Sequence, residues 1–134
     1  MHATVRYIVD EIDPAVTFYT DRLGFRVEML PEGAGFAMLS NGPLRLLLNE
    51  PGAGGAGASA DDGRAPEPGG WTRFQLQVAD LDAELAALRD AGARIRTSVV
   101  GGRAGRQIVI EDPSGNAVEL FEPVSAGAGG AGTA

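Results

Sequence analysis

The sequence predicts an α+β protein built from two βαβββ modules, whose strands form a curved mixed-sheet cup with the helices on its outer face. Two observations lead to this prediction. The order of elements in the first half of the chain recurs in the second, and most predicted strands have one apolar and one polar face. The 134 residues suit a single domain. We expect it to span residues 1–124, followed by a disordered tail rich in Gly and Ala at 125–134.

The first module is expected in residues 1–50. Its opening strand at 4–9 mixes β-branched and aromatic side chains. Asp13 and Pro14 then supply the N-cap and the first residue of a helix that Gly24 ends. Three further strands, separated by turn residues, are expected at 25–30, 35–40 and 44–49.

The second module, residues 71–124, repeats this order. A strand at 72–78 precedes a helix at 81–91 that Gly92 ends. The remaining strands are expected near 94–100, 106–111 and 117–121. Two sequence echoes support an internal duplication. They pair Val-Asp-Glu-Ile-Asp at 9–13 with Val-Ala-Asp-Leu-Asp at 78–82, and Leu-Gly-Phe-Arg at 23–26 with Ala-Gly-Ala-Arg at 91–94.

Residues 51–70 separate the two modules. They are mainly Gly, Ala, Pro and Asp and have no apolar periodicity. A loop of this length is either a flexible linker or a functional lid, and the sequence leaves both open.

Alternation along the strands places side chains on two faces of each sheet. The apolar set needs the cover that two amphipathic helices can provide; it consists of Val5, Tyr7, Val9, Leu44, Leu46, Leu48, Phe74, Leu76, Val78, Ile108, Ile110, Val118 and Leu120. The opposite set is rich in long hydrogen-bonding side chains, namely Arg6, Arg45, Arg73, Gln75, Gln77 and Gln107. These suit a cup that holds a ligand, although a solvated outer face would also tolerate them.

Composition excludes several classes of function. The net charge of -7 repels a phosphate backbone, so nucleic acid is not expected as a partner. The absence of cysteine excludes disulfides, thiolate metal sites and cysteine nucleophiles. No apolar run approaches the roughly 20 residues of a membrane span, and the N-terminus lacks signal-peptide features. We therefore expect no membrane partner and a cytoplasmic location.

Two loops superficially suggest ligand sites. Gly101–Gly105 has the glycines of a phosphate loop but lies between strands without a following helix, so we interpret it as a hairpin loop. Asp112–Asn116 has the Pro, Gly and Asn spacing of a turn, which favours a turn over a cation loop.

Four stretches of the sequence resemble the vicinal oxygen chelate superfamily, which includes glyoxalase I, extradiol dioxygenases and bleomycin-resistance proteins. They are Tyr-Ile-Val-Asp-Glu-Ile-Asp at 7–13, Phe-Tyr-Thr at 18–20 with Leu-Gly-Phe at 23–25, Leu-Gln-Val-Ala-Asp-Leu at 76–81, and Glu-Asp-Pro-Ser-Gly-Asn-Ala-Val-Glu-Leu at 111–120. The resemblance implies paired modules that form a cup, and a homodimer.

In metal-dependent members of this superfamily, ligands come from the first, fourth, fifth and eighth strands. These positions correspond here to Thr4, Leu47 or a neighbour of it, Arg73 and Glu119, of which only Glu119 is a ligand type. The single histidine, His2, precedes the first position by two residues and is not expected to bind metal. We therefore predict no metal and no cofactor.

The candidate ligand-binding residues are Thr4, Arg6, Phe36, Met38, Arg45, Leu47, Trp71, Arg73, Gln75, Gln77, Gln107, Glu119 and Phe121. Glu119 is either a lone general acid or base or, as we expect, the partner of Arg73 or another arginine of the cup. The aromatic residues and Met38 offer surfaces for an aromatic ligand or, equally, for a dimer interface.

These features predict a metal-independent protein that binds a small molecule, such as an aromatic natural product or antibiotic, and sequesters or carries it. The alternative is an enzyme of the same fold, an isomerase, lyase or dioxygenase, that uses Glu119 as acid, base or metal ligand. A third class, a protein-interaction module, would need an apolar outer patch, which the sequence does not clearly show.

Overall fold

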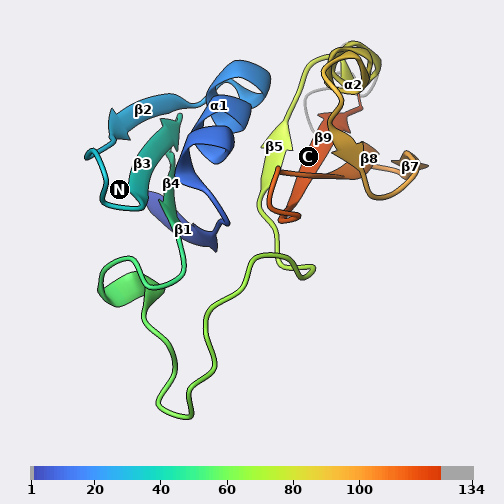
Figure 1. The fold of residues 1–134 in the computed structure, drawn as a ribbon. Coiled ribbons are helices and arrows are strands. Elements are labelled where there is room, and N and C mark those ends of the chain that lie inside the picture. The colour runs from blue at the N-terminus through green and yellow to red at the C-terminus, as the bar shows by residue number, and fades with distance from the viewer. Residues whose placement is uncertain (1, 125–134) are drawn as a thin grey trace. The chain divides into compact units, whose positions relative to one another are not determined.

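The chain folds into two units, each with one mixed sheet and one helix, in the computed structural model, which describes residues 2–124 (Figure 1). The first unit comprises the chain up to Gly70 together with 112–116, and the second comprises Trp71–Glu111 and the chain from Ala117 onward. The tail predicted at 125–134 lies outside the described residues.

The first unit contains β1 (Ala3–Ile8), α1 (Ile12–Leu23), β2 (Arg26–Met29), β3 (Phe36–Asn41), β4 (Leu44–Asn49) and the short 3-10 helix η1 (Gly55–Gly57). Its sheet has the order β1-β4-β3-β2, in which β1 and β4 are parallel and the other pairs antiparallel.

The second unit contains β5 (Gln75–Gln77), α2 (Leu81–Asp90), β6 (Arg94–Ile95), β7 (Val100–Gly101), β8 (Gly105–Glu111) and β9 (Ala117–Pro123). Its sheet has the order β5-β9-β8-β6, with β7 also paired to β8, and β5 and β9 are parallel. The α+β class and the repeated strand–helix–strands order are confirmed.

Two predicted strands of the second module are wrong in extent. The expected strand at 72–78 is reduced to the three residues of β5. The expected strand at 94–100 is divided into β6 and β7, because the backbone N–H groups of Arg96 and Thr97 both donate to the carbonyl of Val109, at 2.8 and 3.2 Å. Two donors on one acceptor break the ladder as a bulge does.

The start of α1 also differs from the prediction. Asp13 is not the N-cap; the helix begins at Ile12, and the capping residue Glu11 makes no side-chain bond. The carboxylate of Glu50, from the segment after β4, accepts the free N–H of Ile12 at 2.9 Å instead. Gly24 ends the helix with φ of 73°, as expected of a left-handed C-cap.

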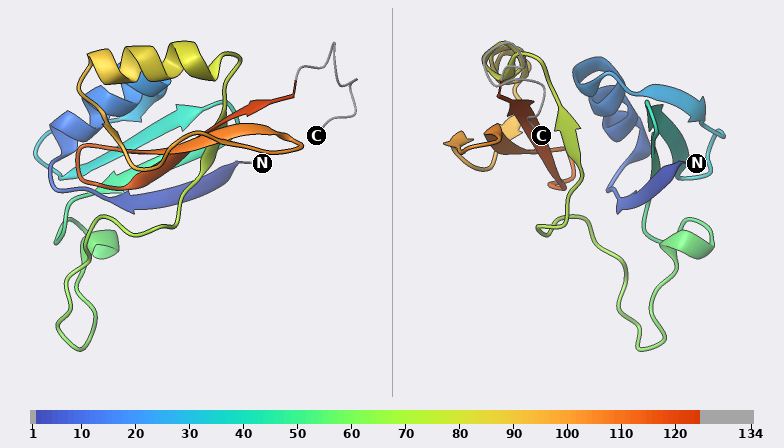
Figure 2. Two further views of the ribbon diagram at one scale, coloured as in Figure 1. Left: turned by 90° about the vertical axis from the view of Figure 1, so that its right-hand side faces the viewer. Right: turned by 180° about the vertical axis from the view of Figure 1, so that it is seen from behind.

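Each helix covers one face of its own sheet (Figure 2). In the first unit, Val16, Tyr19 and Leu23 of α1 are buried, as are Leu39, Leu46 and Leu48 of the sheet. In the second, the buried side chains are Leu81, Leu85 and Leu88 of α2 with Ile108, Ile110, Val118 and Leu120 of β8 and β9. The burial of β3 and β4 alternates as the predicted separation into two faces requires. In β8 and β9 it does not, because Val109, Ala117 and Glu119 of the opposite face are buried as well.

Residues 51–70 follow β4 as a turn, η1 and a loop that extends away from the first sheet (Figures 1 and 2). The turn is tight: a Cβ added to Gly57 would lie 2.5 Å from the carbonyl oxygen of Glu50. Asp62 accepts from the backbone and side chain of Arg64 farther along the loop. Whether this segment acts as a linker or a lid stays a prediction. None of the helices among residues 2–124 has the length and hydropathy of a membrane span.

The predicted turn at Asp112–Asn116 belongs to the first unit, and its carboxylate is 1% exposed. Asp112 accepts from the Tyr19 hydroxyl at 2.8 Å, from the Asn116 side chain at 3.0 Å and from the backbone N–H groups of Ser114 and Asn116, both at 2.9 Å. Asn116 in turn donates to the Ile8 carbonyl at 2.7 Å. These bonds satisfy a buried charge within the fold, which supports the interpretation as a structural turn.

We predict that Tyr19→Phe lowers the free energy of unfolding by about 1–3 kcal/mol, because Asp112 loses one donor while remaining buried. Asp112→Asn should lower the free energy of unfolding more, because an amide nitrogen, which cannot accept, would then face some of the same donors. Urea denaturation measures both. Ser114→Ala, which removes only an exposed bond to the Asp10 backbone, is the control.

The Tyr19 variant also tests a pH dependence. Burial, followed by the nearby Asp112 charge, raises the pKa of Tyr19 well above 10.0. A raised pKa contributes stability that is present below the unfolded-state pKa and is lost as pH rises toward the folded-state value. Wild type should therefore lose more stability than Tyr19→Phe as the pH is raised above about 10, and equal losses would contradict this assignment.

Candidate functional site

Six candidate residues share the face of the first sheet that α1 leaves uncovered, which we call the first open face. The β1–β4 register pairs Thr4 with Arg45 and Arg6 with Leu47, and the β3–β4 register pairs Met38 with Leu47. Phe36 lies two residues from Met38 and has the same orientation. Ser40, Asn49, Arg26 and Glu28 complete this face by the same alternation.

Polar contacts order most of the charged groups on the first open face. Arg6 donates to Asn49, whose side chain is buried and donates to the Ala53 carbonyl. Glu28 accepts from Ser40 at 2.5 Å and from Arg26 at 3.0 Å. The hydrogen bond from Ser40 makes the largest contribution to lowering the pKa of Glu28. The bond and charge of Arg26 lower it further, and the charge of Arg45 contributes least.

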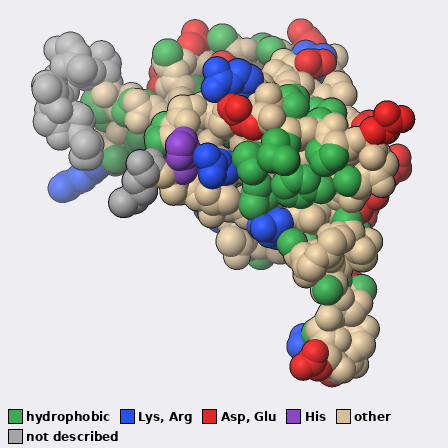
Figure 3. Space-filling model, turned by 90° about the vertical axis from the view of Figure 1, so that its left-hand side faces the viewer, with side chains coloured by type: hydrophobic (Ala, Val, Ile, Leu, Met, Phe, Trp, Pro, Cys, Tyr) green, Lys and Arg blue, Asp and Glu red, His purple; other side chains and the backbone are tan. Residues whose placement is uncertain are grey.

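A cavity of about 280 Å³ opens on this face. It is lined by His2, Arg26, Glu28, Met38, Ser40, Gly42 and Arg45. Figure 3 shows hydrophobic side chains gathered on one side of the molecule, with arginines, an acidic side chain and the single histidine beside them. Polar groups around an apolar surface are typical of a small-molecule site.

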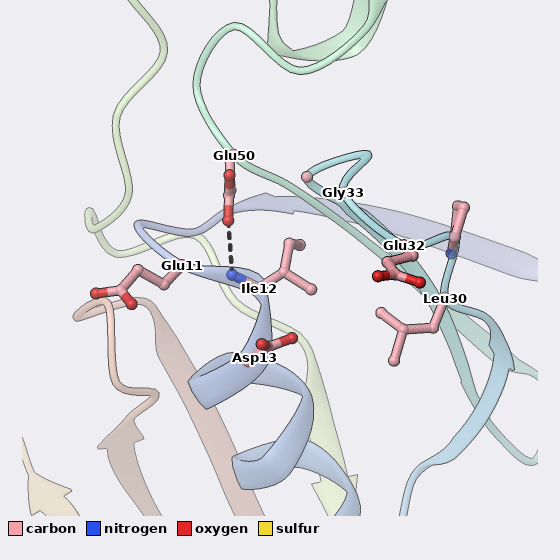
Figure 4. A pocket seen from close by; sticks show the side chains of 9 residues that line it. Glu11, Ile12, Asp13, Leu30, Glu32, Gly33 and Glu50 are labelled. Atoms are coloured by element: carbon pink, nitrogen blue, oxygen red, sulfur yellow. Dashed lines mark hydrogen bonds between the residues drawn. The ribbon is translucent and has the colours of Figure 1, made fainter.

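A larger cavity of about 430 Å³ lies at the start of α1 and contains none of the candidate residues (Figure 4). Its lining includes the carboxylates of Glu11, Asp13, Glu32 and Glu50. Glu50 points to the backbone N–H of Ile12, the bond that caps the helix (Figure 4). The clearest role of this region is therefore to start α1.

Six further candidates share the corresponding face of the second sheet, the second open face. The β5–β9 register pairs Gln75 with Glu119 and Gln77 with Phe121, and the β8–β9 register pairs Gln107 with Phe121. Arg73 precedes β5 and reaches the same face through its bond to Glu119.

Glu119 is 8% exposed and is held by two donors. Arg73 Nε lies 2.9 Å from its Oε1 and Gln75 Nε2 lies 2.6 Å from its Oε2. The expected pairing of Glu119 with Arg73 is confirmed. Because each carboxylate oxygen accepts a bond and the formal charge is balanced, the group is better suited to organise its neighbours than to act as a free base.

Trp71 is 62% exposed, and the guanidinium of Arg96 lies 4.6 Å from its ring centroid. Arg96 is also bonded to Glu111 at 2.9 Å. Arg96 and Glu111 are not among the site residues predicted from the sequence. Alternation of Arg94 and Arg96 around Ile95 was the available signal, but the bulge at Val109 hid which face Arg96 would occupy.

The residues at the superfamily's metal-ligand positions do not fit a metal. On the first open face the positions are Thr4 and Leu47; on the second they are Arg73 and Glu119, which are bonded to each other. Among residues 2–124, no group of three or more His, Cys, Asp or Glu side chains is arranged to hold a metal ion. A cation beside Glu119 would also meet the charge of Arg73.

Comparison with protein families matches residues 2–120 to the model described as Glyoxalase/Bleomycin resistance protein/Dioxygenase superfamily. Comparison with curated proteins finds no match.

Several solved structures are similar in fold. TioX from Micromonospora sp. ML1 has 22% identity and a TM-score of 0.71, covering 92% of this chain and 99% of its own. TnmS3, an antibiotic binding protein from Streptomyces sp. CB03234, has 22% identity and a TM-score of 0.68, covering 92% and 96%. Lactoylglutathione lyase from Agrobacterium tumefaciens has 20% identity and a TM-score of 0.70, covering 91% and 92%. At these identities the likeness concerns the fold alone.

We predict that the purified protein holds no stoichiometric divalent metal and that a chelator leaves its thermal stability unchanged. The reason is that Glu119 is engaged by Arg73 and Gln75 and that Thr4 and Leu47 offer a weak ligand or none. Elemental analysis checks this. One tightly held Zn, Ni, Mn or Fe per chain would contradict it.

Proposed function

The chain belongs to the Glyoxalase/Bleomycin resistance protein/Dioxygenase superfamily, and within it we propose that it is a metal-independent protein that binds a small molecule. We further propose that it sequesters or carries an antibiotic or another natural product. This role places it in the cytoplasm, where it would meet a compound that is made in or enters the cell.

The observation that supports this proposal most is the state of Glu119. It is the only ligand-type residue among the four mapped positions, and its two oxygens accept from Arg73 and Gln75. A carboxylate bonded in this way can order Arg73 and Gln75 as hydrogen-bond donors to a ligand. Binding without conversion needs no more than such a fixed polar surface beside apolar contact area.

Each of the two open faces carries its own set of proposed contacts. On the second, Trp71 and Phe121 provide flat contact area, and Arg73, Gln75, Gln77 and Gln107 provide hydrogen bonds. On the first, the corresponding residues are Phe36, Met38 and Leu47 with Thr4, Arg6 and Arg45. All basic contacts come from arginine, since the chain has no lysine, and a guanidinium both binds planar oxygen pairs and stacks on rings.

We predict that Trp71→Ala and Arg73→Ala each reduce the free energy of ligand binding by about 1–3 kcal/mol. Trp71→Ala removes contact area, and Arg73→Ala removes a charge-assisted hydrogen bond. A panel of antibiotics that includes bleomycin and an anthracycline can be screened by quenching of Trp71, the single tryptophan, and hits measured by calorimetry. Arg103→Ala, on an exposed loop, is the matched control. Unchanged affinity in both variants would refute this placement of contacts.

The alternative of an enzyme that uses Glu119 is tested with the same ligand. The compound should be recovered chemically unchanged after incubation, as judged by mass spectrometry. Formation of product at a rate that Glu119→Gln abolishes would replace sequestration by catalysis.

We also propose that the chain is a homodimer, as the family resemblance implies. Strand β2 lies at the edge of the first sheet with all four residues exposed, and Val27 and Met29 on it are large apolar side chains. An exposed apolar edge favours a symmetric partner. Sedimentation should give a dimer mass at micromolar concentration, and Val27→Lys should shift it toward monomer, whereas Asp21→Lys on α1 should not. A monomer mass for the wild type would count against the proposal.

A further inference from the structure

We propose that the first open face recognises the acid group of an organic anion, a carboxylate, sulfonate or phosphate, and that Arg45 is the residue that binds it. This inference rests on the proposed small-molecule function and specifies the class of ligand for this face.

The environment of Arg45 is the first argument. Arg45 is half-buried in β4 between Thr4 of β1 and Ser40 of β3, and it lines the 280 Å³ cavity. Among residues 2–124, no hydrogen bond or ion pair satisfies its guanidinium. The other half-buried arginines, Arg96 and Arg106, form ion pairs at 2.9 and 2.6 Å. The guanidinium of Arg45 therefore has donors that no protein acceptor uses, and the acid group of a ligand would accept from them.

The charge of the surrounding face is the second argument. The first open face carries Arg6, Arg26 and Arg45 against one acid, Glu28, which gives a formal charge of +2 as three arginines minus one glutamate. The whole chain carries -7. Glu28 already accepts bonds from Arg26 and Ser40, so its charge is largely compensated. This face is therefore a basic region on an acidic protein, which attracts anions.

The apolar neighbours of Arg45 indicate that the anion carries an apolar body. Met38 and Leu47 occupy the row next to Arg45, and Phe36 lies one row farther along the same face. Figure 3 shows hydrophobic side chains adjoining the basic ones. A small inorganic anion would use only the guanidinium, whereas an anion with an apolar body would also cover this surface.

A matched pair of probes tests the proposal. 8-Anilinonaphthalene-1-sulfonate carries a sulfonate on the ring system of N-phenyl-1-naphthylamine, which is uncharged, and both fluoresce when bound to apolar surfaces. We expect Arg45→Ala to lower the affinity for the sulfonate about tenfold or more. The affinity for the neutral probe should change less than about twofold. Met38→Ala should weaken both probes. Raising the NaCl concentration from about 50 to about 500 mM should lower the affinity for the sulfonate and leave that for the neutral probe unchanged.

The control is Arg22→Ala, which removes an exposed arginine from α1 and should leave both affinities unchanged. Equal affinity of the sulfonate for wild type and Arg45→Ala, or no sulfonate binding to wild type, overturns the assignment of Arg45. If the antibiotic panel nevertheless yields a ligand, the proposed small-molecule function stands and only the role of Arg45 is refuted. A shift from dimer to monomer in Arg45→Ala would mean that a second copy of the chain covers this face, and this would also overturn the proposal.

Discussion

Each sheet of this protein is covered by one helix, and one helix can cover only one of the two faces to which strand side chains alternately point. In the first unit α1 buries Leu39, Leu46 and Leu48, and in the second α2 lies against the sheet that contributes Ile108, Ile110 and Leu120. Within residues 2–124, neither unit has a second helix to cover the opposite face of its sheet. The residues there are consequently free from the demands of helix packing, and their arginines, glutamines and aromatic groups are the candidates for function.

The two open faces differ in how their charges are satisfied. On the second, Glu119 is bonded to Arg73 and Gln75, and Glu111 is bonded to Arg96, which in turn lies over Trp71. These contacts form a surface whose geometry is set before any ligand arrives. On the first, Arg6 is bonded only to a neutral amide, and Arg45 has no hydrogen bond or ion pair among residues 2–124, although its charge acts on Glu28. The second face therefore offers shape and fixed donors, whereas the first offers uncompensated positive charge.

The periodicity of the strands and the stop signals of the helices were sufficient to predict the fold class and the two faces of β3 and β4. They predict Leu46 and Leu48 as core and Arg45 and Leu47 as open face, because alternation depends only on sequence. The start of α1 was not predictable in this way, since its cap is Glu50, which lies 38 residues from Ile12 in sequence and is brought there by the turn after β4. For the same reason the bond between Tyr19 and Asp112, which lie 93 residues apart, was not predictable.

The candidate site shows the same division. The pairing of Glu119 with Arg73 was predictable, because both residue types fall on one face and a buried carboxylate needs a partner. Arg96 was missed, since its contacts depend on a bulge where two backbone donors share the Val109 carbonyl. Local sequence patterns predict the face on which a residue of a regular strand lies. They do not predict which side chains a residue at a bulge will contact.

The contact between Arg73 and Glu119 connects these points to the chemistry. A neutral imidazole at position 73 would leave the Glu119 carboxylate able to share a cation with it, since both are metal-ligand types. A guanidinium at that position cannot bind a cation and instead takes the carboxylate as its own acceptor, at 2.9 Å. Compared with an imidazole, the guanidinium therefore offers no metal ligand, adds a repulsive charge and engages the carboxylate of Glu119. The second open face therefore combines a fixed polar surface with a poor cation site, which is the physical reason for the proposal that it binds a molecule without converting it.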